Sequence, residues 1–363
     1  MKVTIFISSL GGGGAESVCV SLANALAKRG WQVNLLVLNL NNAVHKENLG
    51  PQVEIISLNV QHTRNAILPL KKYIKKANPD KFLVFNYELT VLLVLLRIWL
   101  RTDYKIIARN INSLRSKQQQ AQSWWRKFVV YPLIHRLYYK VDLVINQCYA
   151  MQDELISLYP QIISKSVVIY NPVNSRIHEA AKDIASTSIV KHNYLLSVGR
   201  LEKQKAFHLA IESFAILAKD FPELKLKVVG EGQLESKLKM LAVNLSIEDR
   251  VDFLGYQKNM IPIYQQANAT VLTSLYEGFP NVLVESITLG TPVIAFDCPS
   301  GPSEIIEEGI NGSLVKSRDV QVLATAIRNV LINPPSPEQV QQNTDKYDID
   351  NIVVQYEKML LKP

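Results

Sequence analysis

The 363-residue sequence contains few cysteines and few histidines, three and six respectively. Cys19, Cys148 and Cys298 are odd in number, far apart and without the spacing of metal ligands. This pattern argues against a disulfide framework and for a reducing compartment. No cluster of histidine and cysteine has the spacing of a zinc site either. The sequence therefore predicts neither a small disulfide-rich fold nor a cysteine-based metal centre.

Long hydrophobic runs are also missing. The longest, residues 89–100, contains Arg97 and is too short to span a bilayer. Residues 1–7 continue directly into a glycine loop without a small-residue cleavage site, so they predict a first strand rather than a signal peptide. With 48% hydrophobic residues in a chain of this length, we expect two cores and hence two domains. Together with the cysteine pattern, the expected first strand predicts a cytoplasmic protein.

Acidic residues are scarce in the first half of the chain. Residues 1–175 hold 21 Lys and Arg against 9 Asp and Glu, a balance of +12, whereas the remainder holds 19 against 23, a balance of −4. Such asymmetry predicts an anionic partner for the first half, either nucleic acid or an acidic membrane surface.

Two segments of the basic half are candidates for contact with that partner. The helix expected over 64–77 carries four clustered lysines, Lys71, Lys72, Lys75 and Lys76. This cluster is either a solvated face or a phospholipid-facing one. Trp124 and Trp125 begin an aromatic, basic segment that suits either the headgroup layer of a membrane or a helix packed on the sheet. The charge balance favours the membrane, and no nucleic-acid recognition motif is present.

The order of the predicted elements indicates parallel sheets. Residues 3–7 are predicted to form a strand, 15–29 a helix with one apolar face, and 33–38 a second strand, which together make a βαβ unit. Four consecutive glycines, 11–14, occupy the first turn, which is either a phosphate-binding turn at a helix N-terminus or a plain tight turn. Glu16 stands where the dinucleotide fingerprint of oxidoreductases would need glycine.

This alternation continues to about residue 170, and a second series begins at residue 194. Between them, residues 179–191 are polar with little periodicity, which is typical of a boundary between domains. We expect one domain over 1–173, a second over 174–345 and a terminal helix within 346–363 that crosses back to the first.

Charged residues lie at two strand-to-helix turns of the second half. Glu277 follows a short apolar strand, and Glu285 lies about two helical turns further on, so their carboxylates can reach different parts of one ligand. Arg200 and Lys205 flank another such turn, where a guanidinium and an ammonium would offset the charge of a diphosphate.

Three motifs resemble those of retaining glycosyltransferases of family GT4, in the order found in that family. They are Gly13-Gly-Ala-Glu16, the Gly-Arg-Leu-x-x-x-Lys pattern ending at Lys205, and the acid-x7-acid pattern from Glu277 to Glu285. The resemblance implies an α/β chain of the GT-B fold, with two Rossmann-like domains whose parallel sheets face each other across a cleft. The first domain would bind the acceptor and the second the nucleotide sugar.

The resemblance also implies roles for individual residues. The catalytic set would be Glu277, Arg200, Lys205 and Asn110. Donor-binding residues would be Gly13, Gly14, Gly199, Arg200, Lys205, Tyr256, Gly278, Phe279, Asn281, Val282 and Glu285. Glu277 would contact the donor sugar, Glu285 the ribose. Asn110 stands where many members carry a histidine, and Arg109 beside it would meet an anionic acceptor; neither is a good proton shuttle at neutral pH.

The implied reaction is transfer of a sugar from a UDP-sugar, or a GDP-sugar, to a glycan or lipid-linked acceptor at the inner face of a membrane. No metal or cofactor is expected, because Arg200 and Lys205 would neutralise the diphosphate. Asp348-Ile-Asp350 resembles a metal motif of another fold but lies beside the C-terminal tail. The alternatives are a nucleotide-sugar epimerase of this architecture and a non-catalytic basic module that binds membrane.

Overall fold

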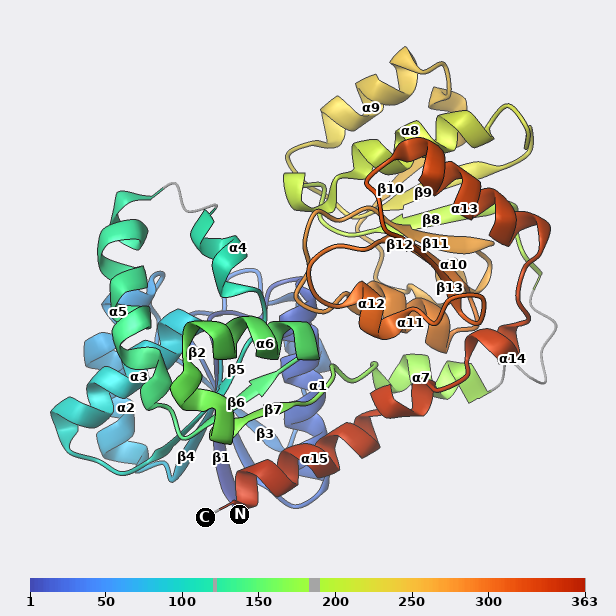
Figure 1. Cartoon of the computed structure of the whole chain (residues 1–363). Helices are drawn as coiled ribbons and strands as arrows, with labels where there is room; N and C mark the ends of the chain where they lie inside the picture. The colour runs from blue at the N-terminus through green and yellow to red at the C-terminus, as the bar shows by residue number, and fades with distance from the viewer. Residues whose placement is uncertain (120–122, 183–189, 363) are drawn as a thin grey trace. The chain divides into compact units, whose positions relative to one another are not determined.

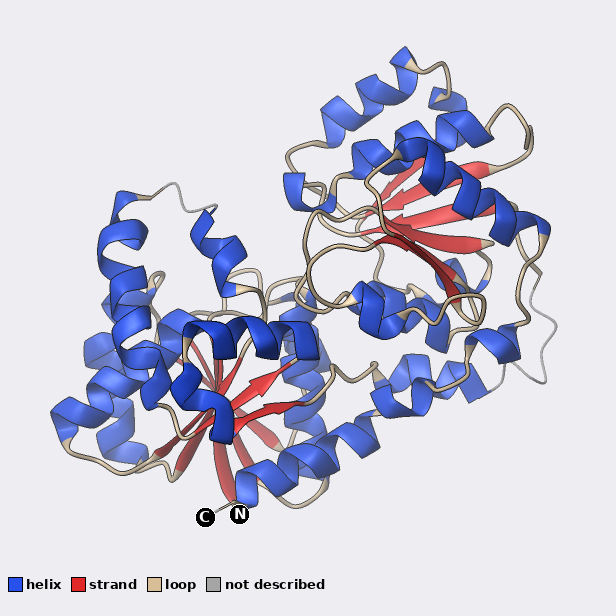
Figure 2. Ribbon diagram, in the orientation of Figure 1, coloured by secondary structure: helices blue, strands red, loops and turns tan. Residues whose placement is uncertain are grey.

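The computed structural model describes residues 1–119, 123–182 and 190–362. The chain forms two compact units, which we call unit 1 (Met1–Asn174 with Lys346–Pro363) and unit 2 (Ser175–Asp345). Unit 1 thus continues one residue beyond the boundary expected from the sequence pattern. Each unit is an α/β structure with helices on both faces of one parallel sheet (Figures 1 and 2).

The sheet of unit 1 has seven parallel strands in the order β3-β2-β1-β4-β5-β6-β7. Their bounds are β1 Lys2–Ile7, β2 Gln32–Val37, β3 Val53–Ser57, β4 Lys81–Phe85, β5 Lys105–Arg109, β6 Leu143–Asn146 and β7 Ser166–Val168. The central strands are buried on both faces, which explains why they are continuous hydrophobic runs in the sequence.

Helices cover both faces of this sheet. On one face lie α1 (Gly14–Lys28) and α15 (Ile349–Leu361), whose apolar sides share a core with β1 and β2. On the other lie α2 (Ile67–Ala77), α3 (Tyr87–Leu100), α5 (Tyr131–Leu137) and α6 (Tyr149–Leu158). The remaining helical elements are α4 Leu114–Gln119, η1 Val44–Asn48, η2 Thr63–Ala66, η4 Tyr138–Lys140, η5 Pro160–Lys165 and the π-helical η3 Arg126–Val130.

The returning helix α15 is part of the unit 1 core. Asp348 caps its N-terminus by accepting a hydrogen bond from the Asp350 backbone, 2.6 Å away, so this acid stabilises a helix end. Glu357 accepts hydrogen bonds from Arg29 and from the Trp31 indole, at 2.6 and 2.8 Å. These contacts fasten α15 to the end of α1.

The sheet of unit 2 has six parallel strands in the order β10-β9-β8-β11-β12-β13. Their bounds are β8 Tyr194–Val198, β9 Lys225–Val229, β10 Val251–Gly255, β11 Ala269–Leu272, β12 Val293–Phe296 and β13 Gly312–Val315. The helical elements are α7 Ser175–Lys182, α8 Phe207–Leu217, α9 Glu235–Asn244, α10 Ile261–Gln265, α11 Asn281–Thr288, α12 Pro302–Ile305, α13 Val320–Ile332, α14 Pro337–Val340, η7 Lys203–Lys205 and η8 Glu248–Arg250; η9, Thr344–Tyr347, lies at the boundary with unit 1. Helices α8, α9 and α13 share one hydrophobic core with the sheet.

Across the part of the chain that the structure describes, no helix is long and apolar enough to span a membrane.

Candidate functional site

The central strands of unit 2 bring two distant loops together. β8 and β11 are neighbours and parallel, so the loops that follow them emerge at the same edge of the sheet. The first loop carries Lys205 and the second Glu277. The Lys205 ammonium lies 2.6 Å from the Glu277 carboxylate, and the Ser274 hydroxyl donates to the same oxygen at 2.5 Å. Residues far apart in the sequence therefore form one charged cluster.

Both members of this ion pair are shielded from water. The Lys205 side chain is 17% exposed and that of Glu277 is 7% exposed. A charge-assisted hydrogen bond in such a place is strong, but either partner left alone would be a poorly solvated charge. The pair therefore places an ammonium and a carboxylate side by side, and each can bind a complementary group of a ligand.

Hydrogen bonds to backbone carbonyls fix the two loops relative to each other. The Leu275 N–H donates to the Gln204 carbonyl at 2.8 Å, and the Gln204 side chain donates to the Tyr276 carbonyl at 3.0 Å. From the loop after β12, the Ser300 hydroxyl donates to the Glu277 carbonyl at 2.5 Å. The turn that carries Glu277 is thus held from two neighbouring loops.

Arg318 also supports this turn, and no sequence motif pointed to it. Its guanidinium donates to the Leu275 carbonyl at 2.7 Å. Burial and the Glu277 carboxylate raise the pKa of the nearby Cys298 thiol to about 12, while the charges of Lys205 and Arg318 act in the opposite direction. Arg318 is therefore a second cation, after Lys205, close to the acidic turn.

Glycines are required where the strand ends approach each other. Gly230 has φ +129°, and a Cβ there would lie 2.0 Å from the Gly199 carbonyl oxygen. A Cβ at Gly232 would lie 2.5 Å from the Leu201 carbonyl oxygen. No side chain fits at either position, so the loop that carries Arg200 rests directly on the neighbouring backbone. Gly199 itself has φ +152°.

Arg200 does not join the buried cluster. Its side chain is 66% exposed and pairs with Glu202 at 3.1 Å. An exposed pair of this kind is weak, which leaves the guanidinium free to change partner. Contact between Arg200 and a diphosphate remains a prediction.

The second predicted acid, Glu285, lies in a different environment. It projects from α11 and accepts a hydrogen bond from the Tyr264 hydroxyl at 2.9 Å. Loss of water around the carboxyl raises its pKa to about 7, while the bond from Tyr264 acts in the opposite direction. Glu277 is thus paired with a cation, whereas the partner of Glu285 is a neutral hydroxyl.

The other predicted donor residues of unit 2 lie around the start of α11 and the end of β10. Phe279 is 6% exposed, so its ring belongs to the protein interior, whereas Tyr256 is 51% exposed. Gly278 follows Glu277, and Asn281 and Val282 are the first two residues of α11. Their contact with a ligand remains a prediction.

In unit 1 the glycine loop leads into α1. Gly13 is the N-cap residue and Gly14 the first residue of the helix, so their N–H groups lie at its positive end. The Glu16 carboxylate bends back to this point, as shown by the distance of 2.3 Å between its Oε2 atom and a Cβ atom added to Gly13. His45, which no motif indicated, hydrogen-bonds to the Gly13 backbone. Burial lowers the pKa of its imidazole below the ordinary value, and the bond to Gly13 acts in the opposite direction.

Arg109 is the last residue of β5 and Asn110 follows it, and both lie in the interior of unit 1. Arg109 is 1% exposed, and its guanidinium donates to the Tyr356 hydroxyl at 2.6 Å and to Asn171. Asn110 is 2% exposed; it accepts from Tyr138 at 2.6 Å and donates to Asn146 at 2.9 Å. In this arrangement both side chains serve the protein's own structure, so an acceptor could reach them only after these bonds opened. Their predicted contact with the acceptor, and a catalytic role for Asn110, remain predictions.

Among the residues that the structure describes, no group of three or more His, Cys, Asp or Glu side chains is placed to hold a metal ion.

Two family profiles match the chain, one in each half. Residues 12–176 match "Glycosyltransferase Family 4" and residues 180–347 match "Glycosyl transferases group 1". The two profiles together account for nearly all of the chain.

Two bacterial relatives are similar over almost the whole length. One, from Campylobacter jejuni, is N-acetylgalactosamine-N,N'-diacetylbacillosaminyl-diphospho-undecaprenol 4-alpha-N-acetylgalactosaminyltransferase; it is 28% identical over 91% of this chain and 90% of its own. The other is an uncharacterized glycosyltransferase of Haemophilus influenzae, 27% identical over 99% of both chains.

Solved structures share the fold. The complex of Anabaena HepE with UDP superimposes with a TM-score of 0.80 at 19% identity, and the lipopolysaccharide outer core galactosyltransferase WaaB with 0.75 at 19% identity. Each comparison covers 99% of both chains.

Proposed function

Because the chain belongs to the GT4-type glycosyltransferases with the GT-B fold, we propose that it transfers a sugar from a nucleotide-sugar donor to a glycan or lipid-linked acceptor, with retention of anomeric configuration. The observation that carries this proposal is the Lys205–Glu277 pair at the carboxyl edge of the unit 2 sheet. It places a cation and an anion where parallel α/β sheets bind their ligands.

The chemistry follows from the charges that change during the reaction. As the bond between sugar and diphosphate breaks, negative charge grows on the leaving nucleotide diphosphate. Lys205 and Arg200 would stabilise that charge, so we propose that the reaction needs no metal ion. Once Lys205 turns to the diphosphate, the Glu277 carboxylate is released toward the sugar, where positive charge develops. Glu285 would accept a hydrogen bond from the ribose.

The donor and the acceptor are proposed from the relatives. HepE was solved with UDP and with UDP-glucose, which supports a UDP-sugar ahead of a GDP-sugar. Two Campylobacter jejuni relatives are named for transfer to saccharides on diphospho-undecaprenol or PP-undecaprenol, which supports a lipid-linked acceptor in the assembly of a surface glycan. Such an acceptor would require the enzyme to work at the inner face of the cytoplasmic membrane.

The test is product formation with an undecaprenyl-diphosphate saccharide and a panel of UDP-sugars and GDP-sugars, in buffer containing EDTA. We expect one donor to extend the saccharide with an α-linkage, and Glu277→Gln to lower kcat at least about a hundredfold. Free nucleotide with an isomerised sugar and no extended acceptor would favour an epimerase instead. If neither product formed while the protein still bound membranes, the non-catalytic module would be the better account.

A further inference from the structure

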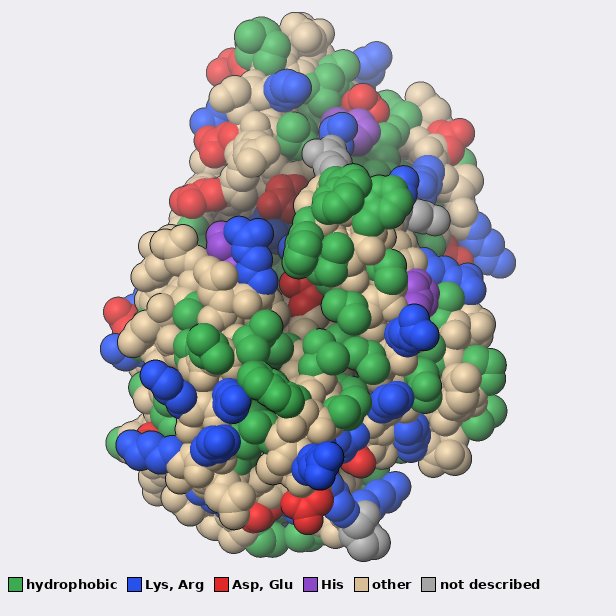
Figure 3. Space-filling model, turned by 90° about the vertical axis from the view of Figure 1, so that its left-hand side faces the viewer, with side chains coloured by type: hydrophobic (Ala, Val, Ile, Leu, Met, Phe, Trp, Pro, Cys, Tyr) green, Lys and Arg blue, Asp and Glu red, His purple; other side chains and the backbone are tan. Residues whose placement is uncertain are grey.

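One side of unit 1 exposes an unusual number of hydrophobic side chains. They project from α2, α3 and the helical segment that begins at Trp124 and continues through η3 into α5, and these helices pack against one another on one face of the sheet. Its members, between 37% and 68% exposed, are Ile67, Leu68, Leu95, Ile98, Trp99, Trp124, Trp125, Phe128 and Leu133. Figure 3 shows hydrophobic side chains spread over this side, with Lys and Arg among and around them. We call these nine residues the apolar face.

We propose that the apolar face docks unit 1 onto the surface of an anionic lipid bilayer. This docking rests on the proposed function, because it assigns a surface to the membrane contact of the enzyme. The observations that support it come only from the residues of unit 1. Single exposed hydrophobics are common in soluble proteins, whereas a contiguous group of this size marks an interaction site.

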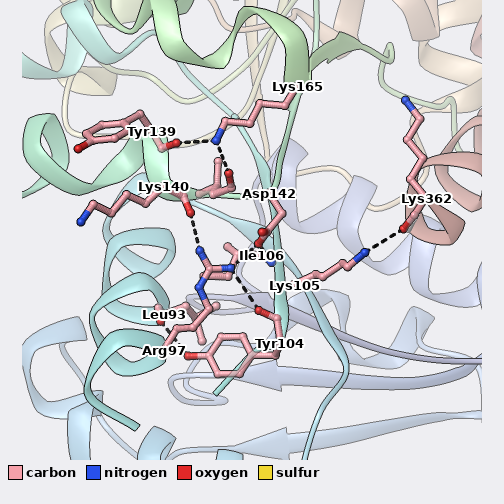
Figure 4. Close-up of polar contacts among 11 residues, drawn as sticks. Leu93, Arg97, Tyr104, Lys105, Ile106, Tyr139, Lys140, Asp142, Lys165 and Lys362 are labelled. Atoms are coloured by element: carbon pink, nitrogen blue, oxygen red, sulfur yellow. Dashed lines mark hydrogen bonds and ion pairs between the residues drawn. The ribbon is translucent and has the colours of Figure 1, made fainter. Parts of the chain in front are cut away.

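The helix α3 shows how the face is constructed. Its last turns contain one cation, Arg97, whose guanidinium is directed inward (Figure 4). There it pairs with the Asp142 carboxylate and donates to the Lys140 carbonyl at 2.5 Å and the Tyr104 carbonyl at 3.3 Å. The outward positions Leu95, Ile98 and Trp99 lie three and four residues apart, on one side of the helix. The charge is therefore kept inside and the apolar side chains outside.

Aromatic rings on the face lie next to cations. The Lys71 ammonium lies 3.7 Å from the centre of the Trp99 ring, and the Lys127 ammonium lies 5.7 Å from that of Phe128. The Trp124 and Phe128 rings pack at 5.6 Å. Tryptophans beside lysines suit the headgroup layer, where the ring is partly buried and the ammonium reaches phosphate.

The charge of the surrounding sequence selects an anionic surface. Residues 61–140, which supply all of the face, contain 16 Lys and Arg but only 3 Asp and Glu. One of those acids, Glu88, lies 3.6 Å from Arg126 and is offset by it. Such a surplus attracts acidic lipid headgroups and would oppose contact with a second copy of the same surface. Nucleic acid would match the charge but would leave the apolar side chains without partners.

Vesicle flotation of the full chain tests the proposal. Vesicles of phosphatidylcholine containing 30 mol% phosphatidylglycerol are compared with phosphatidylcholine alone, at 50 and 500 mM NaCl. We expect binding to the anionic vesicles that weakens at high salt, with a blue shift of tryptophan emission. The buried Trp31 provides a constant background signal, because the three other tryptophans lie on the face.

Two double variants separate the apolar and the charged contributions. Trp124→Ser with Trp125→Ser should lower the vesicle partition coefficient at least tenfold and reduce the emission shift. Lys72→Gln with Lys75→Gln should lower it about 25-fold, at about fivefold for each lysine. Met240→Ser with Val243→Ser is the matched control, since both side chains are exposed in α9 of unit 2; it should bind as the unsubstituted protein does.

Three results of the flotation experiment would overturn the proposal: no flotation, equal flotation with neutral and anionic vesicles, or equal loss in the α9 control. A dimer in sedimentation velocity that the Trp124/Trp125 variant dissociates would assign the face to a second copy and would also overturn it. Stabilisation of each variant by UDP is measured in parallel. Retained stabilisation with lost flotation separates this proposal from the proposed function, because the donor site would be intact.

Discussion

At the scale of single residues, the Lys205–Glu277 pair contributes to stability and also holds two charged groups where a ligand can bind them. Two charges held 2.6 Å apart and shielded from water stabilise each other, but each one depends on its partner. The Ser274 hydroxyl supplies a further hydrogen bond to the carboxylate. A ligand that brings its own negative charge to Lys205 can therefore replace Glu277 as the partner of an ammonium that is already held at the site.

Removing one partner should harm unit 2 more than removing both. Lys205→Met leaves a shielded carboxylate and Glu277→Gln a shielded ammonium, and each should lower the free energy of unfolding by about 3 kcal/mol. The double variant should lose less stability than either single variant, and therefore much less than the sum of the two single losses. Calorimetric unfolding of all three proteins measures this coupling, and additive losses would show that the two groups do not interact.

The environment of Glu285 predicts a dependence of stability on pH. Its pKa of about 7 in the folded chain lies above the ordinary 4.5, so folding favours the protonated form. The stability that this group contributes is therefore present below pH 4.5 and is lost as the pH rises toward 7. Glu285→Gln should remove that loss and be more stable than the unsubstituted protein at pH 8, by up to about 3 kcal/mol. Unfolding midpoints at pH 5 and pH 8 measure it; identical pH responses in the two proteins would contradict the assignment.

At the scale of elements, the strand ends of unit 2 hold one another in place. The Gly199 N–H donates to the Val229 carbonyl at 2.9 Å, and the Gly230 N–H donates to the Gly255 carbonyl at 2.8 Å. These bonds continue the sheet beyond the three strands and set the start of the loop that carries Arg200 and Lys205.

Gly230→Ala should disturb that loop. The new methyl group would lie 2.0 Å from the Gly199 carbonyl oxygen, so the backbone must move. Gly309→Ala is the matched control, because Gly309 also has positive φ but a methyl group added there would have no described atom within 4 Å. The control should lose about 1 kcal/mol of stability through backbone strain alone. Gly230→Ala should lose more and should also weaken UDP binding; equal effects of the two variants would show that the close approach is unimportant.

The returning helix α15 should contribute strongly to the stability of unit 1. Leu360 is 1% exposed, whereas the adjacent Leu361 is 54% exposed. Leu360→Ala should lower the free energy of unfolding by about 2 to 5 kcal/mol, because it leaves a cavity in the core. Leu361→Ala should change it by less than about 0.5 kcal/mol. Urea unfolding followed by far-UV circular dichroism compares the two, and equal losses would mean that α15 is not docked as described.

Local pattern predicted the elements better than it predicted their partners. The buried strands are continuous hydrophobic runs, and the acid-x7-acid spacing pointed to Glu277 and Glu285. Sequence did not show that Arg109 would be buried, because its partners Tyr356 and Asn171 are distant in the chain. His45 and Arg318 stand in no motif, and only the fold brings them to the Gly13 backbone and the Leu275 carbonyl.

The residues around Trp124 and Trp125 are partly exposed and partly buried, so each of the two interpretations that the sequence left open describes some of them. Trp124, Trp125 and Phe128 are exposed, as the membrane interpretation requires, whereas Tyr131 is 9% exposed and packs in the core. Sequence alone could not place Trp99 beside them, because that depends on how α3 packs against α2 and α5.

At the scale of the whole molecule, the two halves of the chain differ in charge as they differ in proposed task. The +12 half carries the apolar face and the −4 half carries the Lys205–Glu277 cluster. A strongly basic first half and a mildly acidic second half suit an enzyme that takes its donor from solution and its acceptor from an acidic membrane.

The proposed function requires that unit 2 binds a nucleotide diphosphate through Lys205 without a metal ion. The most direct measurement is thermal unfolding of the full chain with UDP, GDP, ADP or CMP, each with and without EDTA. At about a hundredfold excess over its dissociation constant, the correct nucleotide should stabilise the fold by about 2.7 kcal/mol. We expect UDP to do so equally in EDTA, and Lys205→Met to abolish the effect. Stabilisation that disappears in EDTA, or that survives Lys205→Met unchanged, would contradict the account.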